Sequence, residues 1–482
     1  MNFTSLAPLL LGGLLAAALS WLGMAAALQR SGQQAHGYLH AVVPALLLIM
    51  AAGVWLGGRD LTSNFLLPEF RPDPPRPALL DTVQPVLSLL LLAVSFERIL
   101  SRALLPGQRT LSPWLALSFF LFWLGSTASP ALLGAHPAWS HDLLYPLVIG
   151  LAATLASAND TERVLRWSRN ALLLLMLAGV LLIPWKTTLV LDQNYQQGLI
   201  DGLPRFGGLA THPVSMGLLA QLGLLCLMAR PLQQVWLNRV AWGLGLGVLL
   251  MAQSKTAWLA FLLCSAVMMA YRIGPLLKRQ LGDVQQAAVP LSLLTLALCT
   301  VSALLLMLGL GDAAWIDRLL HTPEGQQLRS FTGRDRIWAI AWEEWLAHRT
   351  FGWGPQIWGE AYRQSIGLAN ATHAHNQLMD TLSRAGLVGA AALLLYGLVL
   401  TLLALRCSRA TRGLSLALLL ALWLRAGSEV PLLLMGYGPD FIAHLLLLAV
   451  LAAASEKRVA VPRQAPGPVS AVGSHHLGRH PA

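Results

Sequence analysis

The sequence predicts an all-α polytopic membrane protein. Of its 482 residues, 56% are hydrophobic and only 11% are charged, against about 25% charged residues in a typical soluble domain. Apolar stretches close to the length that crosses a bilayer as a helix recur from one end of the chain to the other. These observations exclude a soluble enzyme, a disordered chain and a collagen-like chain. Continuous apolar runs also exclude an outer-membrane barrel, whose strands alternate between apolar and polar residues.

The apolar stretches divide the chain into four regions. Residues 1–310 contain the first ten or so membrane helices, 311–384 form a long outer loop with amphipathic helices, 385–455 form the C-terminal membrane helices, and 456–482 form a disordered tail. Thirteen apolar spans are predicted, at 4–28, 38–57, 79–96, 113–134, 143–158, 170–190, 207–229, 239–252, 256–271, 287–310, 385–405, 413–428 and 441–455. The first is too long and too uniformly apolar for a cleavable signal, so we expect it to remain as a membrane helix.

The basic residues predict the orientation of the chain. Alternating the loops between two sides places 19 of the 33 Lys and Arg residues on one side, which is therefore predicted to be cytoplasmic. Seven of the others lie in the loop 311–384, and long loops have little influence on topology. We expect this loop to face the periplasm of a Gram-negative host and the C-terminus to face the cytoplasm. Thirteen spans would place the N-terminus outside, whereas twelve would place both ends inside.

The same asymmetry explains the formal net charge of +11, so we expect no nucleic-acid partner. The cysteines give no sign of a disulfide framework or of a paired metal site, because Cys226, Cys264 and Cys299 lie in apolar spans and Cys407 lies in a basic loop.

The outer loop contains a predicted amphipathic helix at 334–349, with the sequence RDRIWAIAWEEWLAHR. Ile337, Ile340, Ala341 and Trp345 recur at helical spacing, which places this helix on the outer membrane–water boundary with its tryptophans at the level of the headgroups. The following FGWGPQIW segment (351–358) contains glycines and a proline that indicate a turn.

Two histidines precede the membrane span that follows the outer loop. Asn376 is the predicted N-cap of the helix, and His373 and His375 lie immediately before it. A histidine in this position can serve as a general base at neutral pH. The alternatives are a histidine pair with no chemical role and a zinc pair. Zinc would need two further ligands and only Asp380 is near in sequence, so we expect no metal.

Several cationic residues flank apolar spans on the same outer side. They are Arg205, Lys255, Arg334 and Arg336. Each could extend to the interface and leave only its aliphatic stem in the apolar layer. A cation between closely spaced membrane helices more often faces a cavity or a ligand. Taken together with the histidines, these cations indicate a site for an anionic, phosphate-bearing substrate.

Three other polar residues lie at the ends of apolar spans. Arg425 and Glu429 are four residues apart, so we expect them to pair with each other in a structural role. His212, in a Thr-His-Pro step, is expected to form a hydrogen bond within the bundle or to line the same cavity as the cations.

The motifs resemble those of bacterial O-antigen ligases, within the O-antigen ligase/polymerase superfamily. His375-Asn376, nine residues and then Gly386-Leu387-Val388-Gly389 resemble the H-[NSQ]-x9-G-x-x-[GTY] signature of these enzymes. RFGGLATHP at 205–213 is similar to an upstream motif that contains arginine. SKTAWL at 254–259 is similar to a hairpin motif that usually has arginine four residues before leucine. Lys255 replaces that arginine, which keeps the charge and loses bidentate phosphate binding. The resemblance covers roughly 200–395.

The resemblance implies a GT-C-like membrane glycosyltransferase with about twelve transmembrane helices. Such an enzyme, in the bacterial inner membrane, would transfer polysaccharide from undecaprenyl pyrophosphate to the lipid A-core at the periplasmic face. The transfer would invert the anomeric centre and would need no metal or other cofactor. Its partners would be the two lipid-linked glycans and the membrane lipids.

The resemblance also implies roles for the residues. Arg205, Lys255 and an arginine from 334–336 would hold the pyrophosphate, and His375 would be the base. His373 is the second candidate for the catalytic role, and it would otherwise orient the substrate or the loop. The supporting residues would be Asn376, Asp380 and His212.

Alternative functions remain open at this point. An O-antigen polymerase and a protein O-oligosaccharyltransferase belong to the same superfamily. A transporter of lipid-linked glycans would catalyse no chemistry. Inverted repeats with broken helices at the membrane midplane would favour a transporter, but the sequence has no convincing internal repeat and its cations cluster on the outer side.

Overall fold

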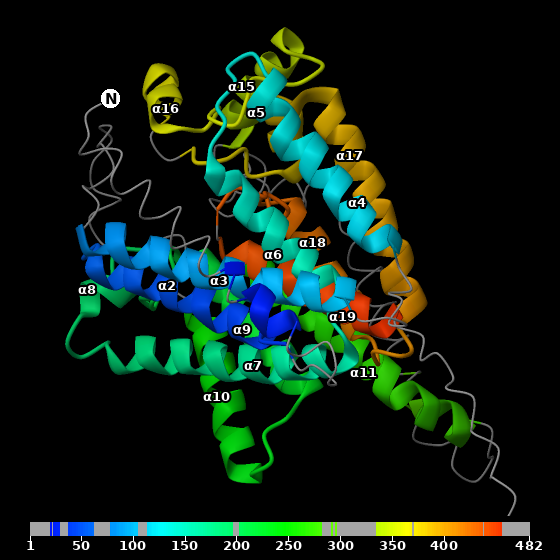
Figure 1. The fold of residues 1–482 in the computed structure, drawn as a ribbon. Helices are drawn as coiled ribbons and strands as arrows, with labels where there is room; N and C mark the ends of the chain where they lie inside the picture. Colours follow the sequence, from blue (N-terminus) through cyan, green and yellow to red (C-terminus); the bar gives the residue numbers. More distant parts are fainter. Residues whose placement is uncertain are drawn as a thin grey trace, which may run out of the picture.

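The computed structural model describes residues 20–21, 23–28, 37–61, 78–104, 113–195, 202–281, 291–292, 295, 334–368, 371–436 and 438–455. This part of the chain is mostly helical, with one two-stranded antiparallel sheet, and Figure 1 shows its arrangement. The first half contains η1 (Leu39–Ala41), α2 (Val42–Leu56), α3 (Ala78–Leu104), α4 (Pro113–Trp123), η3 (Leu124–Ala128), α5 (Ser129–Leu133), η4 (His141–Leu143), α6 (Leu144–Thr154), α7 (Ala158–Leu181), α8 (Thr187–Val190) and β1 (Leu191–Asp192). The second half contains β2 (Arg205–Phe206), α9 (Pro213–Ala229), α10 (Val235–Met251), α11 (Lys255–Leu281), α15 (Arg334–Ala347), α16 (Glu360–Ile366), α17 (Gln377–Cys407), α18 (Leu414–Ala426) and α19 (Pro439–Ser455).

The helices support an all-α membrane protein. Among the described residues, five helices are long and apolar enough to cross a membrane, and five more are apolar but shorter. Most of the spans predicted at 4–28 and 287–310 lie outside the described residues. Residues 311–333 and the tail at 456–482 also lie outside them. The expected number of about twelve spans therefore stays a prediction.

Two helices form the centre of the bundle. Fourteen of the seventeen residues of α9 are buried, as are twelve of the seventeen residues of α19. Both helices are apolar on every face, the pattern of a helix that is surrounded by other helices. Figure 1 shows α7, α11 and α18 around them, and apolar side chains of α11 such as Leu262 remain exposed on the outer surface. An apolar outer surface of this kind suits contact with lipid chains.

Several predicted boundaries were wrong. Helices α3 and α11 continue past the predicted ends at 96 and 271 to Leu104 and Leu281, and the start of α7 differs most. Spans were expected at 143–158 and 170–190 with a basic loop between them, but α7 begins at Ala158 and includes that basic segment. A capping box between Ser157 and Asp160 begins the helix at this position by pairing each side chain with the other residue's backbone N–H. The basic residues of this segment therefore lie on the first turns of a helix, next to the apolar part that follows.

The long helix α17 is interrupted at Gly386, where φ is 63° and ψ is −156°. The loop after α15 satisfies the backbone groups freed at this break. Leu387 N–H donates to Arg349 O at 2.8 Å, and Trp353 N–H donates to Ser383 O at 2.9 Å. The outer loop and the start of α17 therefore form one unit, which Figure 1 shows at one end of the α4–α17 pair.

The predicted helix of the outer loop is confirmed as α15. Its apolar face packs within the loop itself, because Ala341 joins a small core with Ile357, Trp358 and Ala374. Trp338 Nε1 donates to Ala374 O at 2.8 Å, which ties α15 to the segment that carries the two histidines.

Candidate active site

The two histidines converge on a carboxylate from another part of the chain. His373 Nε2 lies 3.2 Å from Glu429 Oε2, and His375 Nδ1 lies 3.3 Å from the same oxygen. Arg334 approaches the other oxygen, Oε1, at 3.5 Å. We call His373, His375 and Glu429 the His–Glu cluster. Its side chains are between 11% and 24% exposed, so a substrate can reach the cluster although little water surrounds it.

The chain before α17 holds the two histidines in place. Asn376 is the N-cap of α17, and its side-chain oxygen accepts from the N–H groups of Leu378 and Met379 at 3.0 and 3.1 Å, as the sequence predicts. The backbone of His375 has a positive φ of 49°. This turn brings the His375 N–H within 3.1 Å of His373 Nδ1, which accepts its hydrogen bond. The two imidazole rings therefore lie side by side.

Asp380 has a structural role in this arrangement. Its carboxylate accepts from the Ala374 N–H at 3.1 Å and forms a buried ion pair with Arg384 at 3.0 Å. Both interactions fix the segment between His373 and His375 on the first turn of α17. The carboxylate is fully engaged by these partners, which disfavours it as a ligand for a metal or a substrate.

The charges in the cluster determine which ring nitrogen remains free. Burial would raise the pKa of Glu429, but the hydrogen bond with His375 and the charges of Arg425 and the two histidines lower it to about 2. An ionised carboxylate only accepts hydrogen bonds, so the Nδ1–H of His375 donates to it. Burial lowers the pKa of His373, which favours the neutral form of this ring.

The two histidines consequently differ. His373 uses Nδ1 to accept from the backbone, and its Nε2 lies 3.2 Å from Glu429 Oε2. His375 donates from Nδ1 to Glu429, which leaves the lone pair of Nε2 without a partner among the described residues. His375 is therefore the member of the pair that can accept a proton from a substrate.

The two upstream cationic motifs pack against each other. Arg205 lies on β2, where it is 6% exposed, and its Nε donates to Ala252 O at 3.0 Å. Gln253 Nε2 donates to Leu203 O at 2.7 Å, which is a second hydrogen bond between the same two segments. The Arg205 guanidinium lies 4.4 Å from the centre of the Tyr195 ring, a cation–π distance. The terminal nitrogens of Arg205 have no partner within the described ranges, and Lys255 follows the contact as an exposed residue at the start of α11.

His212 lies at the end of the loop that follows Arg205. It is the N-cap of α9, and its Nδ1 accepts from Val214 N–H at 3.2 Å. The side chain of His212 is exposed at the surface. Desolvation by the surrounding protein lowers its pKa, with Arg205 contributing, and the negative charge of Glu429 opposes this shift. His212 forms the local N-cap hydrogen bond of α9, and its place in the substrate site stays a prediction.

The structure corrects two expectations. Arg425 does not pair with Glu429. It forms an ion pair with Asp440 on α19, because the turn between α18 and α19 directs Glu429 toward the histidines. Arg334 and Arg336 were treated together, but only Arg334 reaches the cluster. Arg336 donates to Ile366 O at 3.2 Å on the surface of the outer loop.

Two residues of the site were missed from the sequence. Glu429 was assigned to a local pair, and Arg59 was not considered. Arg59 donates to four carbonyl groups, including Leu189 O at 2.7 Å and Gly208 O at 2.9 Å. It therefore fixes the loop that leads into His212. A lone arginine after an apolar span was the available signal for Arg59, whereas no local pattern links Glu429 to histidines 54 residues earlier.

The His–Glu cluster also has the composition of a metal site. Ligand atoms from His373, His375 and Glu429 lie within 4.8 Å of one another, and two histidines with one carboxylate can bind zinc when water fills the fourth position. The guanidinium of Arg334 beside Glu429 opposes a second cation at this place. The surrounding positive charge, from Arg205 as well, suits an anionic substrate.

Comparisons with known proteins cover part of this site. Residues 240–394 match a family model described as O-Antigen ligase. This segment contains Lys255, Arg334 and both histidines, whereas Arg205 and Glu429 lie outside it. A search of curated proteins gave no match.

Proposed function

The chain carries an O-antigen ligase family domain at residues 240–394, and from this premise we propose that it is an O-antigen ligase of the bacterial inner membrane. It would transfer a polysaccharide from undecaprenyl pyrophosphate to the lipid A-core at the periplasmic face. The observation that carries this proposal is the free Nε2 of His375, held by Glu429 beside the guanidinium of Arg334. A base next to phosphate-binding cations is what glycosyl transfer from a lipid pyrophosphate requires.

The donor is activated by its own leaving group. Pyrophosphate leaves with its negative charge, so Arg205, Lys255 and Arg334 would stabilise the charge that develops on it. The guanidinium of Arg205 presents its terminal nitrogens for this purpose, since only its Nε is used by the backbone. No nucleotide would be consumed, because the bond to be broken already joins the sugar to a good leaving group.

The acceptor is activated by His375. Its Nε2 would take the proton from the acceptor hydroxyl while the hydroxyl oxygen attacks the anomeric carbon from the side opposite the pyrophosphate. This direct displacement inverts the anomeric centre and forms no covalent intermediate with the protein. Glu429 would hold the Nδ1–H and stabilise the imidazolium that forms.

A transfer assay tests this function. The purified protein is mixed with lipid-linked polysaccharide and rough lipopolysaccharide, without ATP, and the ligated product is separated by gel electrophoresis. We expect product formation that EDTA leaves unchanged. Loss of activity with EDTA and recovery with zinc would instead establish the His–Glu cluster as a metal centre.

The same assay separates the proposal from its nearest alternative. An O-antigen polymerase uses a second lipid-linked glycan as its acceptor, and a protein O-oligosaccharyltransferase uses a protein hydroxyl. Omitting lipopolysaccharide should therefore abolish the product. Chain elongation in its absence would identify a polymerase. Translocation of the lipid-linked glycan without transfer would identify a transporter.

A further inference from the structure

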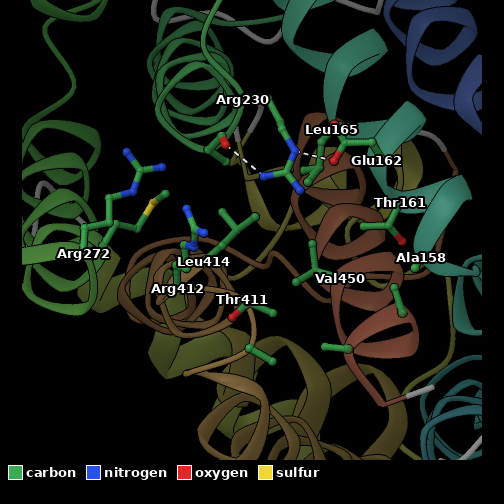
Figure 2. Close-up of a pocket in the computed structure, with 15 residues that line it drawn as sticks. Ala158, Thr161, Glu162, Leu165, Arg230, Arg272, Thr411, Arg412, Leu414 and Val450 are labelled. Atoms are coloured by element: carbon green, nitrogen blue, oxygen red, sulfur yellow. Dashed lines mark hydrogen bonds and ion pairs between the residues drawn. The ribbon is translucent and has the colours of Figure 1, made fainter. Parts of the chain in front are cut away.

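A cavity of about 600 Å³ lies where α9 ends, and Figure 2 shows the residues that line it. Its lining comes from α7, α9, α11, α19 and the hairpin between α17 and α18. His212 caps the start of α9 and Arg230 ends the same helix. With a rise of 1.5 Å per residue, these two ends lie roughly 25 Å apart. The cavity is therefore separate from the candidate active site.

Three arginines surround this cavity. Arg230, Arg272 and Arg412 come from three different segments, and Figure 2 shows their guanidinium groups around the open space. Glu162 is the single acidic residue in the lining, and Arg230 already pairs with it. Arg166 also pairs with Glu162, at 2.7 Å. The lining therefore retains a positive charge that no acidic side chain of the described residues balances.

The arginines are placed to receive a ligand. The Nε atom of Arg272 is buried and has no hydrogen-bond partner within the described part of the chain. A buried donor without a partner is unfavourable unless a ligand or water fills the position. Arg412 has a positive φ of 51° in the tight hairpin before α18, and the hairpin bond from Gly413 N–H to Ser408 O at 2.8 Å holds it there.

An apolar groove adjoins the cationic cavity. It has a volume of about 440 Å³, and Arg272 lines both spaces. The rest of this groove is mostly apolar and includes Leu227, Trp242, Phe261 and Met269. Met269 is 42% exposed on the outer surface of α11, so the groove opens toward the region that lipid chains occupy. A free phosphate would make no use of such a groove.

We propose that the cavity binds the headgroup of an acidic phospholipid, with an acyl chain in the adjoining groove. The basic loops on this side are those that the distribution of Lys and Arg assigns to the cytoplasm. Basic pockets between membrane helices on that side are suited to anionic lipid headgroups. The bound lipid would offset part of the positive charge of the three arginines and join α7, α9 and α11 to the α17–α18 hairpin. This site is independent of the proposed transferase activity.

Lipid binding to the full-length protein in neutral detergent tests the proposal. Native mass spectrometry compares dioleoylphosphatidylglycerol with dioleoylphosphatidylcholine, which has the same chains and no net charge. We expect the wild type to bind the acidic lipid at least about tenfold more tightly. Arg412→Gln and Arg272→Gln should each weaken the binding of the acidic lipid on the order of tenfold. Arg409→Gln is the matched control, because Arg409 lies on the same hairpin outside the cavity lining.

Further binding measurements distinguish a lipid headgroup from a soluble phosphate compound as the ligand of the cavity. Short-chain dihexanoylphosphatidylglycerol and soluble glycerol phosphate should compete weakly, since neither fills the apolar groove. Competition by glycerol phosphate at the same concentration as the dioleoyl lipid would overturn the lipid proposal in favour of a free anion. Equal binding of the two dioleoyl lipids, or unchanged binding by Arg412→Gln, would also overturn it. If Arg272→Gln does not fold, the exposed Arg412 still provides the test.

Discussion

At the scale of single residues, the two neighbouring histidines are not equivalent. Both contact Glu429, but the His375 N–H occupies Nδ1 of His373. His373 therefore holds the loop and the carboxylate, and His375 keeps one nitrogen for chemistry. The spacing of the two histidines in the sequence does not predict that their roles differ. The difference in roles arises from the positive φ at His375.

We expect His375→Ala to lower kcat for transfer by about 10²–10⁴, the usual contribution of a positioned base. His373→Gln, which keeps a donor toward Glu429, should cost far less. Donor binding should be unaffected in both variants, and single-turnover transfer measures the chemical step. An active His375→Ala protein beside an inactive His373→Gln protein would assign the base to His373.

The cationic positions should affect use of the donor. Arg205→Ala and Lys255→Ala each remove a charge-assisted contact with the pyrophosphate, which is expected to cost about 1.5–3 kcal/mol in kcat/KM. Lys255→Arg should retain activity because charge and reach both survive. Titration of the donor at fixed acceptor concentration gives these values. Wild-type kinetics in both alanine variants would show that the two side chains only extend to the interface.

His212 should make stability depend on pH. Its pKa is lowered from 6.5 to about 4 in the folded state, so the unfolded chain binds more protons between these values and stability falls as the pH is lowered from 6.5 to 4. Because the His212 side chain is exposed, solvent screens the effect and keeps it small. His212→Asn keeps a good N-cap and removes the titration. Thermal unfolding in detergent at pH 7 and pH 4 should show a smaller loss for this variant, and an identical loss would contradict the assignment.

At the scale of elements, the break in α17 explains a glycine of the sequence motif. Gly386 lies in a backbone region that only glycine occupies readily. A Cβ atom there would lie 2.5 Å from the carbonyl carbon and oxygen of Thr350. The break lets the outer loop pair with the exposed backbone of α17, so the position of the histidines depends on it.

Gly386→Ala is therefore expected to destabilise the protein by at least about 2 kcal/mol. Gly247→Ala on α10 is the control, because its Cβ would meet no atom within 4 Å, and alanine is the better helix former by up to about 1 kcal/mol. The midpoint of thermal unfolding in detergent should fall for Gly386→Ala and stay or rise for Gly247→Ala. Equal midpoints would show that the loop adjusts to the added methyl group.

Across the whole molecule, the two ends of the helical bundle carry different functional groups. The His–Glu cluster lies where α17 begins, and the arginine cavity lies where α9 ends and α18 begins. The topology predicted from Lys and Arg assigns the first end to the periplasm and the second to the cytoplasm.

Reporter fusions test this orientation. A fusion after residue 311 should report a periplasmic position, and a fusion after residue 456 should report a cytoplasmic one. Alkaline phosphatase and green fluorescent protein are suitable reporters because each is active on one side only. The reversed result would remove the basis for a periplasmic reaction and would also place the arginine cavity outside.

Local composition and spacing predicted the membrane class, most helix positions and the Asn376 cap, and they singled out the two histidines as candidates. These features depend on local composition and on spacing within one helix, which a chain displays before it folds. Most of the helices lie within a few residues of the predicted spans. The start of α7 was missed because a capping box overrode the basic composition.

Only the tertiary structure decided which residues meet. The contact of Glu429 with both histidines joins segments 54 residues apart, and Arg59 reaches the loop before His212 across about 150 residues. Such pairings result from the packing of whole helices, so the local spacing of Arg425 and Glu429 predicted the wrong partner. The free nitrogen of His375 follows from the same packing, because the charge and position of Glu429 fix the proton on the opposite side of the ring.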